Sequence, residues 1–169
     1  LTLFDEQIHY HSRASNTMRN QLRLYTELSK LLQVEKKGKS LKTTDLATTL
    51  HEIAERLHKR SIVVLFTDMI NTNEADTEKV FAALQHMRYN KHEVLLFHLA
   101  DKKHEVEFAF ENRPHQFVDM ETGARIKLNP VEIREAYQKA NAQRFTALKL
   151  RCSQYRIDLI EADINQGFN

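Results

Sequence analysis

Two short, almost uninterrupted apolar runs constrain the fold of this chain more than any other feature. They are residues 61–66 (SIVVLF) and 93–97 (EVLLF). Runs of this kind are typical of central strands in a parallel sheet, whose two faces are both covered. Each run follows a segment with helical spacing, which is the order of βαβ units. We therefore expect an α/β fold built on a mostly parallel sheet.

Helical spacing predicts four helices, because apolar residues at steps of three and four fall on one helix face. The four stripes are Met18, Leu22, Tyr25, Leu28 and Leu32; Leu46, Leu50, Ile53 and Leu57; Val80, Leu84 and Met87; and Ile133, Tyr137, Phe145 and Leu148. Asn90 is suited to end the third helix in the left-handed conformation. Asn129 followed by Pro130 marks the start of the fourth helix.

Three further segments have the pattern of strands. Residues 1–4 (LTLF) form another apolar run that we expect to be a buried strand, and residues 157–160 (IDLI) form a final strand. Between Glu105 and Leu128, aromatic residues alternate with polar ones around a turn at Gly123, which indicates a small inserted β-hairpin. No linker or change of composition divides the chain, so we expect one domain over residues 1–169.

Composition and motifs exclude several classes of function. The net charge is only +2, and the basic clusters at 36–42 and 102–104 lie in expected loops beside acidic residues, so no nucleic-acid partner is expected. No apolar run is long enough to span a bilayer. There is no phosphate-binding glycine loop, H-E-x-x-H motif or G-x-S-x-G elbow. The lone Cys152 favours a reducing, cytoplasmic location.

Polar residues gather where the expected strands end. Asp68 follows the first long apolar run, and His98 and Asp101 follow the second. Residues 43–45 (TTD) open the helix that precedes the first run. Ligands of open parallel sheets collect at this edge, and hydroxyl and carboxylate oxygens suit Mg²⁺, Ca²⁺ or Mn²⁺. The alternative is that residues 43–45 only cap their helix and that Asp68 only caps a loop.

A set of short motifs resembles a bacterial family known as domain of unknown function fifty-eight, which has a von Willebrand factor A-like fold. The motifs are residues 59–69 (KRSIVVLFTDM), 90–94 (NKHEV), 97–98 (FH), 117–123 (FVDMETG), 155–158 (YRID) and 163–165 (DIN), with 3–5 (LFD) fitting a preceding strand. The resemblance covers most of the chain from about Thr43 onward. It implies a doubly wound, Rossmann-like sheet with helices on both faces.

The resemblance also implies a divalent-ion site at the carboxyl edge of the sheet. In von Willebrand factor A domains the ion is held by an Asp-x-Ser-x-Ser loop, a Thr and an Asp. Thr44 is similar to the second element, with Thr43 as the near alternative, and Asp68 is similar to the third. The Asp-x-Ser-x-Ser loop and its strand are expected upstream of Leu1. We therefore expect Mg²⁺ or Mn²⁺ in a longer protein, but no tight binding by this chain.

Absence of that strand would leave a gap in the sheet, or an exposed edge that pairs with another copy of the chain. Members of the family are typically encoded beside MoxR-type AAA+ ATPases and act with them in the assembly or maturation of other proteins. The resemblance thus implies a non-enzymatic, protein-binding adaptor with such an ATPase as its partner. The residues expected at the partner surface are Thr43, Asp45, Met69 and Asp101.

Two other classes of function stay open at this point. One is a metal-dependent hydrolase or phosphotransferase that uses Asp68, Asp101 and His98, which would have to converge in a concave pocket. The other is a structural oligomerisation domain that pairs through an exposed apolar sheet edge.

Overall fold

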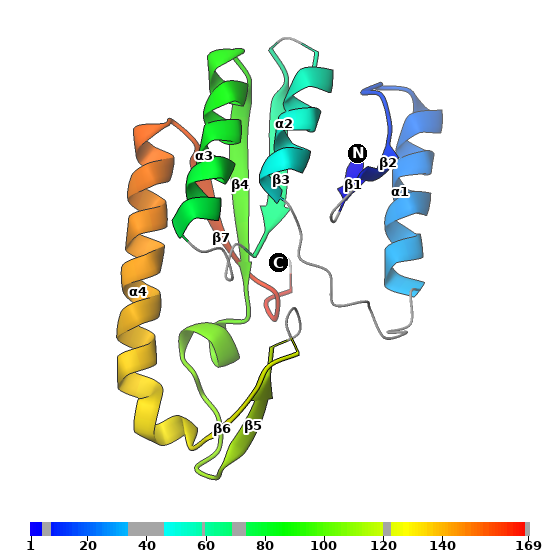
Figure 1. Ribbon diagram of the computed structural model, residues 1–169. Coiled ribbons are helices and arrows are strands. Elements are labelled where there is room, and N and C mark those ends of the chain that lie inside the picture. Colours follow the sequence, from blue (N-terminus) through cyan, green and yellow to red (C-terminus); the bar gives the residue numbers. More distant parts are fainter. Residues whose placement is uncertain (5–7, 34–45, 59, 69–73, 120–122, 168–169) are drawn as a thin grey trace.

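The computed structural model describes residues 1–4, 8–33, 46–58, 60–68, 74–119 and 123–167 (Figure 1). The strands are β1 (Thr2–Phe4), β2 (Ile8–His11), β3 (Ile62–Thr67), β4 (Glu93–Ala100), β5 (His115–Val118), β6 (Arg125–Leu128) and β7 (Asp158–Asp163). The helices are α1 (Met18–Gln33), α2 (Leu46–Arg56), α3 (Glu74–Tyr89), the π-helical turn η1 (Lys102–Val106) and α4 (Pro130–Gln154). None of the described helices has the length and apolarity needed to cross a membrane.

The centre of the fold is a parallel sheet of three strands in the order β3-β4-β7. Val64 is in register with Leu95, and Phe97 is in register with Ile160. Helix α3 connects β3 to β4, and α4 lies between β4 and β7 in the chain. The predicted α/β class and the three apolar runs that form this sheet are therefore confirmed.

Helices α2, α3 and α4 share one core with this sheet (Figure 1). Their buried apolar side chains meet those of alternate strand residues, which point to the same face. The core contains Leu50, Ile53, Leu65, Phe81, Leu84, Met87, Val94, Leu96, Cys152 and Ile157. The stripes predicted for the second and third helices, together with Leu148 of the fourth, therefore cover the sheet from one side.

The opposite face of the sheet has no described helix over it. On β3, Ile62, Val64 and Phe66 point to this face and keep 66%, 48% and 59% of their surface exposed. The apolar run of β3 therefore does not show that both faces of the sheet are covered, because the apolar residues on one of its faces are exposed. A second helical layer, as a doubly wound fold requires, stays a prediction.

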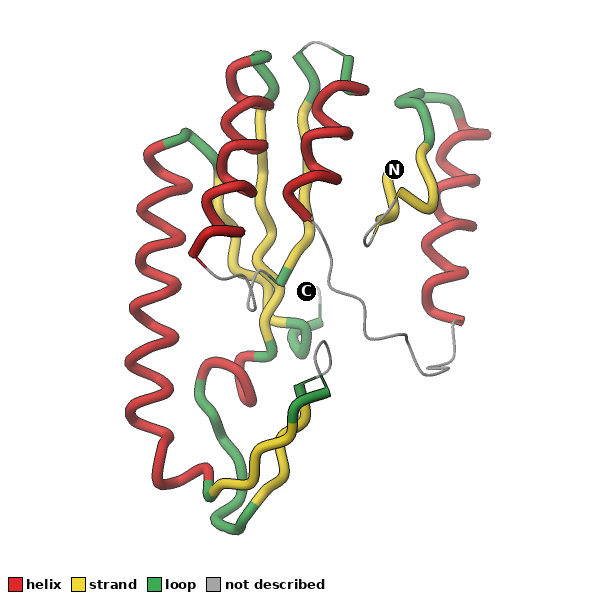
Figure 2. Tube along the Cα trace, in the orientation of Figure 1, coloured by secondary structure: helices red, strands yellow, loops and turns green. Residues whose placement is uncertain are grey.

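The N-terminal segment forms a separate unit. Strand β1 pairs antiparallel with β2 in a two-stranded sheet. The expectation that residues 1–4 join the parallel sheet as a buried strand is therefore wrong for the described residues. Phe4 and Ile8 pack against the main core. Helix α1 follows this hairpin, and Figure 2 shows it apart from the three-stranded sheet.

A basic residue in the left-handed conformation precedes each strand of the parallel sheet. These residues are Arg60, Lys91 and Arg156, with φ of 61°, 64° and 55°. After α3, the amide of His92 donates to Met87 O (3.1 Å) and that of Lys91 to Arg88 O (2.9 Å), which is a Schellman motif. Lys91, and not the predicted Asn90, is thus the left-handed residue. The helix dipole favours the positive charge of Lys91 at this position. The left-handed conformation disfavours its Cβ, which crowds the following carbonyl oxygen.

Lys91→Gly is expected to raise the free energy of unfolding by roughly 0.5–1 kcal/mol, because it removes the steric cost of a Cβ at φ of 64°. Urea denaturation at pH 7 measures the change. Lys91→Ala keeps the Cβ and loses only the charge, so it should be slightly destabilising. A Gly variant less stable than the Ala variant would contradict the steric cost, because both variants lack the charge and differ only in the Cβ.

A small second cluster lies beyond the sheet. The predicted hairpin is confirmed as β5 and β6, although Phe108 and Phe110 lie in the loop before it. Phe108 is buried, with its ring 4.3 Å from that of Tyr137 and 5.8 Å from that of Phe117. Arg134 donates to Phe108 O (3.1 Å) and to Phe110 O (2.9 Å). The first half of α4 therefore carries the hairpin, and the second half packs on the sheet (Figure 1).

Candidate functional site

The three parallel strands end at one edge, and each is followed or closed by a carboxylate. Asp68 follows β3, Asp101 follows β4, and Asp163 is the last residue of β7. Asp163 lies in register with Ala100, so these ends are adjacent. The edge predicted from the ends of the apolar runs is therefore formed.

Asp101 is held firmly by its neighbours. Its carboxylate accepts hydrogen bonds from the His104 amide (3.1 Å) and from Asn165 Nδ2 (2.9 Å), and it contacts His104 Nδ1 at 2.7 Å. Its own amide donates to the Glu105 carboxylate (2.9 Å). The hydrogen bond with His104 lowers the pKa of Asp101 below its usual value. Asp101 thus acts first as the cap of the η1 turn, with both carboxylate oxygens engaged.

Asp163 joins the ends of β4 and β7. Its Oδ1 accepts from the Asn165 amide (3.1 Å) and, at 3.4 Å, from the Lys102 amide. The Ile164 amide also donates to Ala100 O at 3.1 Å. Sequence reasoning did not select Asn165 as a site residue. The available signal was its place in the motif at residues 163–165, since an Asn two residues after an Asp is suited to a turn.

His98 lies just inside the edge. Its side chain is partly buried beside Phe145, with the ring centroids 5.5 Å apart. Burial lowers the pKa of His98, although the nearby carboxylates of Asp68, Glu161 and Glu105 oppose the shift. Burial therefore favours the neutral form of His98. Of these carboxylates, that of Asp68 opposes the shift most, so Asp68 lies near His98.

The structure assembles only part of the predicted site. Asp68 is exposed beside His98, while Asp101 is turned to His104 and Asn165. The residues predicted from the sequence at 43–45 and at Met69 lie outside the described residues. The ends of the apolar runs at residues 61–66 and 93–97 therefore predicted where this edge lies. They did not predict the contacts of Asp101 with His104 and Asn165.

The described residues do not fit a hard cation on their own. Within the described ranges, no group of three or more His, Cys, Asp or Glu side chains is arranged to hold a metal ion. Mg²⁺ and Mn²⁺ need several oxygen ligands, and the oxygens of Asp101 are already engaged.

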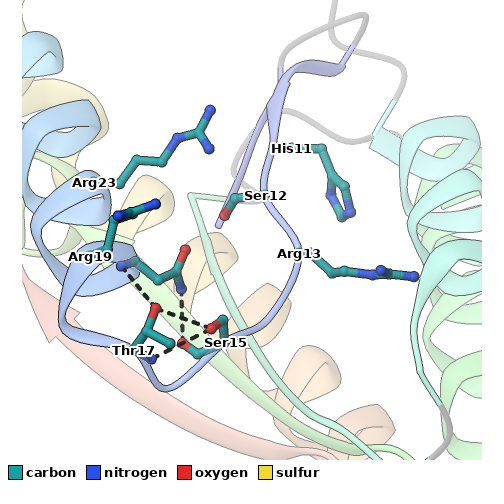
Figure 3. Close-up of a pocket in the computed structure, with 8 residues that line it drawn as sticks. His11, Ser12, Arg13, Ser15, Thr17, Arg19 and Arg23 are labelled. Atoms are coloured by element: carbon teal, nitrogen blue, oxygen red, sulfur yellow. Dashed lines mark hydrogen bonds between the residues drawn. The ribbon is translucent and has the colours of Figure 1, made fainter.

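A basic depression lies at the junction of β2 and α1, with a volume of about 310 Å³ (Figure 3). Its lining residues are His11, Ser12, Arg13, Ser15, Thr17, Arg19, Asn20 and Arg23. The hydroxyl of Thr17 accepts the Asn20 amide at 3.3 Å and caps α1. In Figure 3, Arg13 points away from the two arginines of α1. The three guanidinium groups therefore do not converge on one ligand position.

A family model matches most of the chain. Its description is "Protein of unknown function DUF58", and the match covers residues 1–147. The match includes β3, β4 and thus both Asp68 and Asp101. Searches of curated proteins and of solved structures give no significant match.

Proposed function

This chain belongs to the DUF58 family, and from that premise we propose that it is a protein-binding domain whose partner surface is the carboxyl edge of the parallel sheet. The observation that carries the proposal is the exposed carboxylate of Asp68 beside an edge fixed by the contacts of Asp101 and Asn165. A fixed edge with a projecting charge suits recognition of a folded partner, because little conformational entropy is lost on binding.

The charge at the edge indicates the chemistry of the partner. Asp68, Asp101, Glu105, Glu161 and Asp163 all lie at or near the strand ends. A partner surface rich in Arg or Lys would complement them and speed association. We propose a MoxR-type AAA+ ATPase as this partner, with the chain as an adaptor in the assembly or maturation of other proteins. A cytoplasmic location belongs to the same proposal.

The fold proposed for this role is von Willebrand factor A-like. The parallel order β3-β4-β7 with helical crossovers supports it. Among the described strands, β3 pairs only with β4 and β1 only with β2. A further strand between β1 and β3 would join the two sheets, and its loop could complete a Mg²⁺ or Mn²⁺ site with Thr44 and Asp68. Without such a strand, the edge of β3 is free to pair with another copy of the chain.

The hydrolase or phosphotransferase alternative has weaker support. It needs Asp68, His98 and Asp101 to converge on one substrate. Asp68 and His98 are neighbours, but the Asp101 carboxylate is bound to His104 and Asn165. Burial also lowers the pKa of His98, so this group is a weak base. We therefore retain a binding role and propose no catalytic residue.

Asp68→Ala is expected to weaken binding to a MoxR-type ATPase at least about tenfold, which is about 1.4 kcal/mol, because a charged contact at the centre of the proposed interface is lost. Biolayer interferometry with purified proteins in Mg²⁺ measures the Kd. Glu52→Ala removes the same charge from an exposed position on α2 and should leave the Kd unchanged. Equal Kd values for Asp68→Ala and wild type would contradict the proposed edge, whereas no binding by any form would contradict the proposed partner.

A further inference from the structure

The basic depression at the junction of β2 and α1 carries positive charge that its own surroundings do not balance. It is lined by Arg13, Arg19 and Arg23, and none of its lining residues is acidic. Among the described residues, no acidic side chain pairs with these three guanidinium groups. Other arginines of the chain do pair with a glutamate, namely Arg56, Arg113 and Arg151. A hollow lined by one sign of charge concentrates ligands of the opposite sign.

The other polar groups of the depression are already engaged. The Ser12 hydroxyl accepts a hydrogen bond from the Leu1 amino group at 3.0 Å, and the Thr17 hydroxyl accepts one from the Asn20 amide at 3.3 Å. Asn20 Nδ2 donates to Ser15 O at 2.9 Å. These bonds fix the walls of the depression, so the guanidinium groups are the donors that stay free for a ligand.

Arg19 and Arg23 form the α1 side of the depression. Arg23 lies over the Tyr10 ring at 5.8 Å, which holds its guanidinium group and leaves its N–H donors free. Residues four apart on a helix have Cβ atoms about 5–6 Å apart, so the two arginines are neighbours. A guanidinium group pairs with a carboxylate through two parallel hydrogen bonds. The helix side can therefore bind two carboxylates in a row.

The arrangement of the arginines indicates an extended ligand. In Figure 3, Arg19 and Arg23 lie on one side of Ser12, and Arg13 lies on the other side and points away from them. A single phosphate cannot meet all three groups in this arrangement. In an extended peptide, alternate side chains lie on one side and about 6.6 Å apart, which is close to the spacing of Arg19 and Arg23.

The lining favours a peptide over a nucleic acid. Single-stranded nucleic acids are bound by stacking of their bases on aromatic side chains. Apart from His11, no lining residue is aromatic. The nearby Tyr10 ring faces Arg23, and its hydroxyl is buried. We propose that the basic depression binds an extended acidic segment of another protein, with carboxylates at alternate positions on Arg19 and Arg23 and Arg13 beside them.

This surface lies apart from the carboxyl edge of the parallel sheet. Figure 1 shows that α1 begins near the end of the molecule opposite to the carboxyl ends of β3 and β4. The two surfaces also differ in sign, because the depression is basic and the carboxyl edge is acidic. An acidic segment can therefore bind while a partner occupies the edge, and the proposal does not depend on the identity of that partner.

Fluorescence anisotropy with the 169-residue chain tests the depression. The probe is a labelled peptide in which Glu and Ser alternate, at about 0.05 M salt, where exposed charges are weakly screened. Arg19→Gln combined with Arg23→Gln should weaken binding at least about tenfold, because two carboxylate contacts are lost. Both arginines are exposed, so circular dichroism should show the wild-type fold.

Arg125→Gln combined with Arg144→Gln is the matched control. It removes the same charge from two exposed positions, on β6 and α4, and should leave the affinity unchanged. No binding of the acidic peptide by the wild type would overturn the proposal, as would equal losses in the two double variants. Equal binding of a peptide with Gln in place of Glu would exclude carboxylate recognition. Displacement of the peptide by equimolar inorganic phosphate, or tighter binding of single-stranded oligothymidylate, would assign the depression to another ligand and equally overturn it.

Discussion

Replacing His92 by alanine should lower the free energy of unfolding by about 3 kcal/mol, from an unpaired buried amide together with a cavity. His92 is almost fully buried, and its Nδ1 accepts the Ser61 amide at 3.2 Å. This contact joins the start of β3 to the turn that enters β4, where the His92 carbonyl also accepts from Arg88 at 2.7 Å. Urea denaturation at pH 7.5 measures the loss.

His92→Asn is the matched control, because its side-chain oxygen can replace Nδ1 as the acceptor. This variant should lose much less stability and also part of the pH dependence. Burial lowers the pKa of His92 and of His98, so the unfolded chain binds more protons than the native one as pH falls below the usual value of 6.5. Wild-type stability should therefore fall from pH 7.5 to 5.5, and less steeply in His92→Asn. Equal slopes would contradict the lowered pKa of His92.

Phe108→Ala is expected to destabilise the β5–β6 hairpin by about 3 kcal/mol, because the ring is the centre of the aromatic cluster on α4. Phe108 is not part of the main core, so the opening should stay local. Hydrogen exchange should show faster exchange at residues 115–118 and 125–128, with β3 and β4 little changed.

Val118→Ala is the control for this variant, since Val118 points to the other face of the hairpin and is exposed. It should leave the hairpin amides protected. If Phe108→Ala lost protection equally in the hairpin and in the parallel sheet, the prediction of a local opening would be contradicted. The two clusters would then unfold as one unit.

The parallel sheet was predictable because its strands are continuous apolar runs separated by helical spacing. Residues 1–4 have the same composition, yet they form an antiparallel pair with β2. A run of this length carries no information about its partner strand, which depends on contacts distant in sequence. The turn before β4 was misplaced by one residue for a similar reason, since the Schellman hydrogen bonds select Lys91 over the intrinsically better Asn90.

The candidate site was predictable in position but not in its contacts. Asp68 and Asp101 were found because polar residues directly follow apolar strands. The hydrogen bond of Asp101 with Asn165 joins residues 64 positions apart, and no local pattern reports it. The Ser61–His92 hydrogen bond spans 31 positions and was equally hidden. Ser61, His92 and Asn165 lie in the motifs that carry the family resemblance, and these two hydrogen bonds give a physical reason for their presence there.

Hydrogen exchange of the chain with and without the MoxR-type ATPase tests the central claim most directly. Binding at the carboxyl edge predicts added protection at the strand ends, in residues 98–106 and 160–166, while the amino ends of β3 and β4 keep their exchange rates. Protection confined to the amino ends of the strands or to the β5–β6 hairpin would contradict a partner surface at Asp68 and its neighbours.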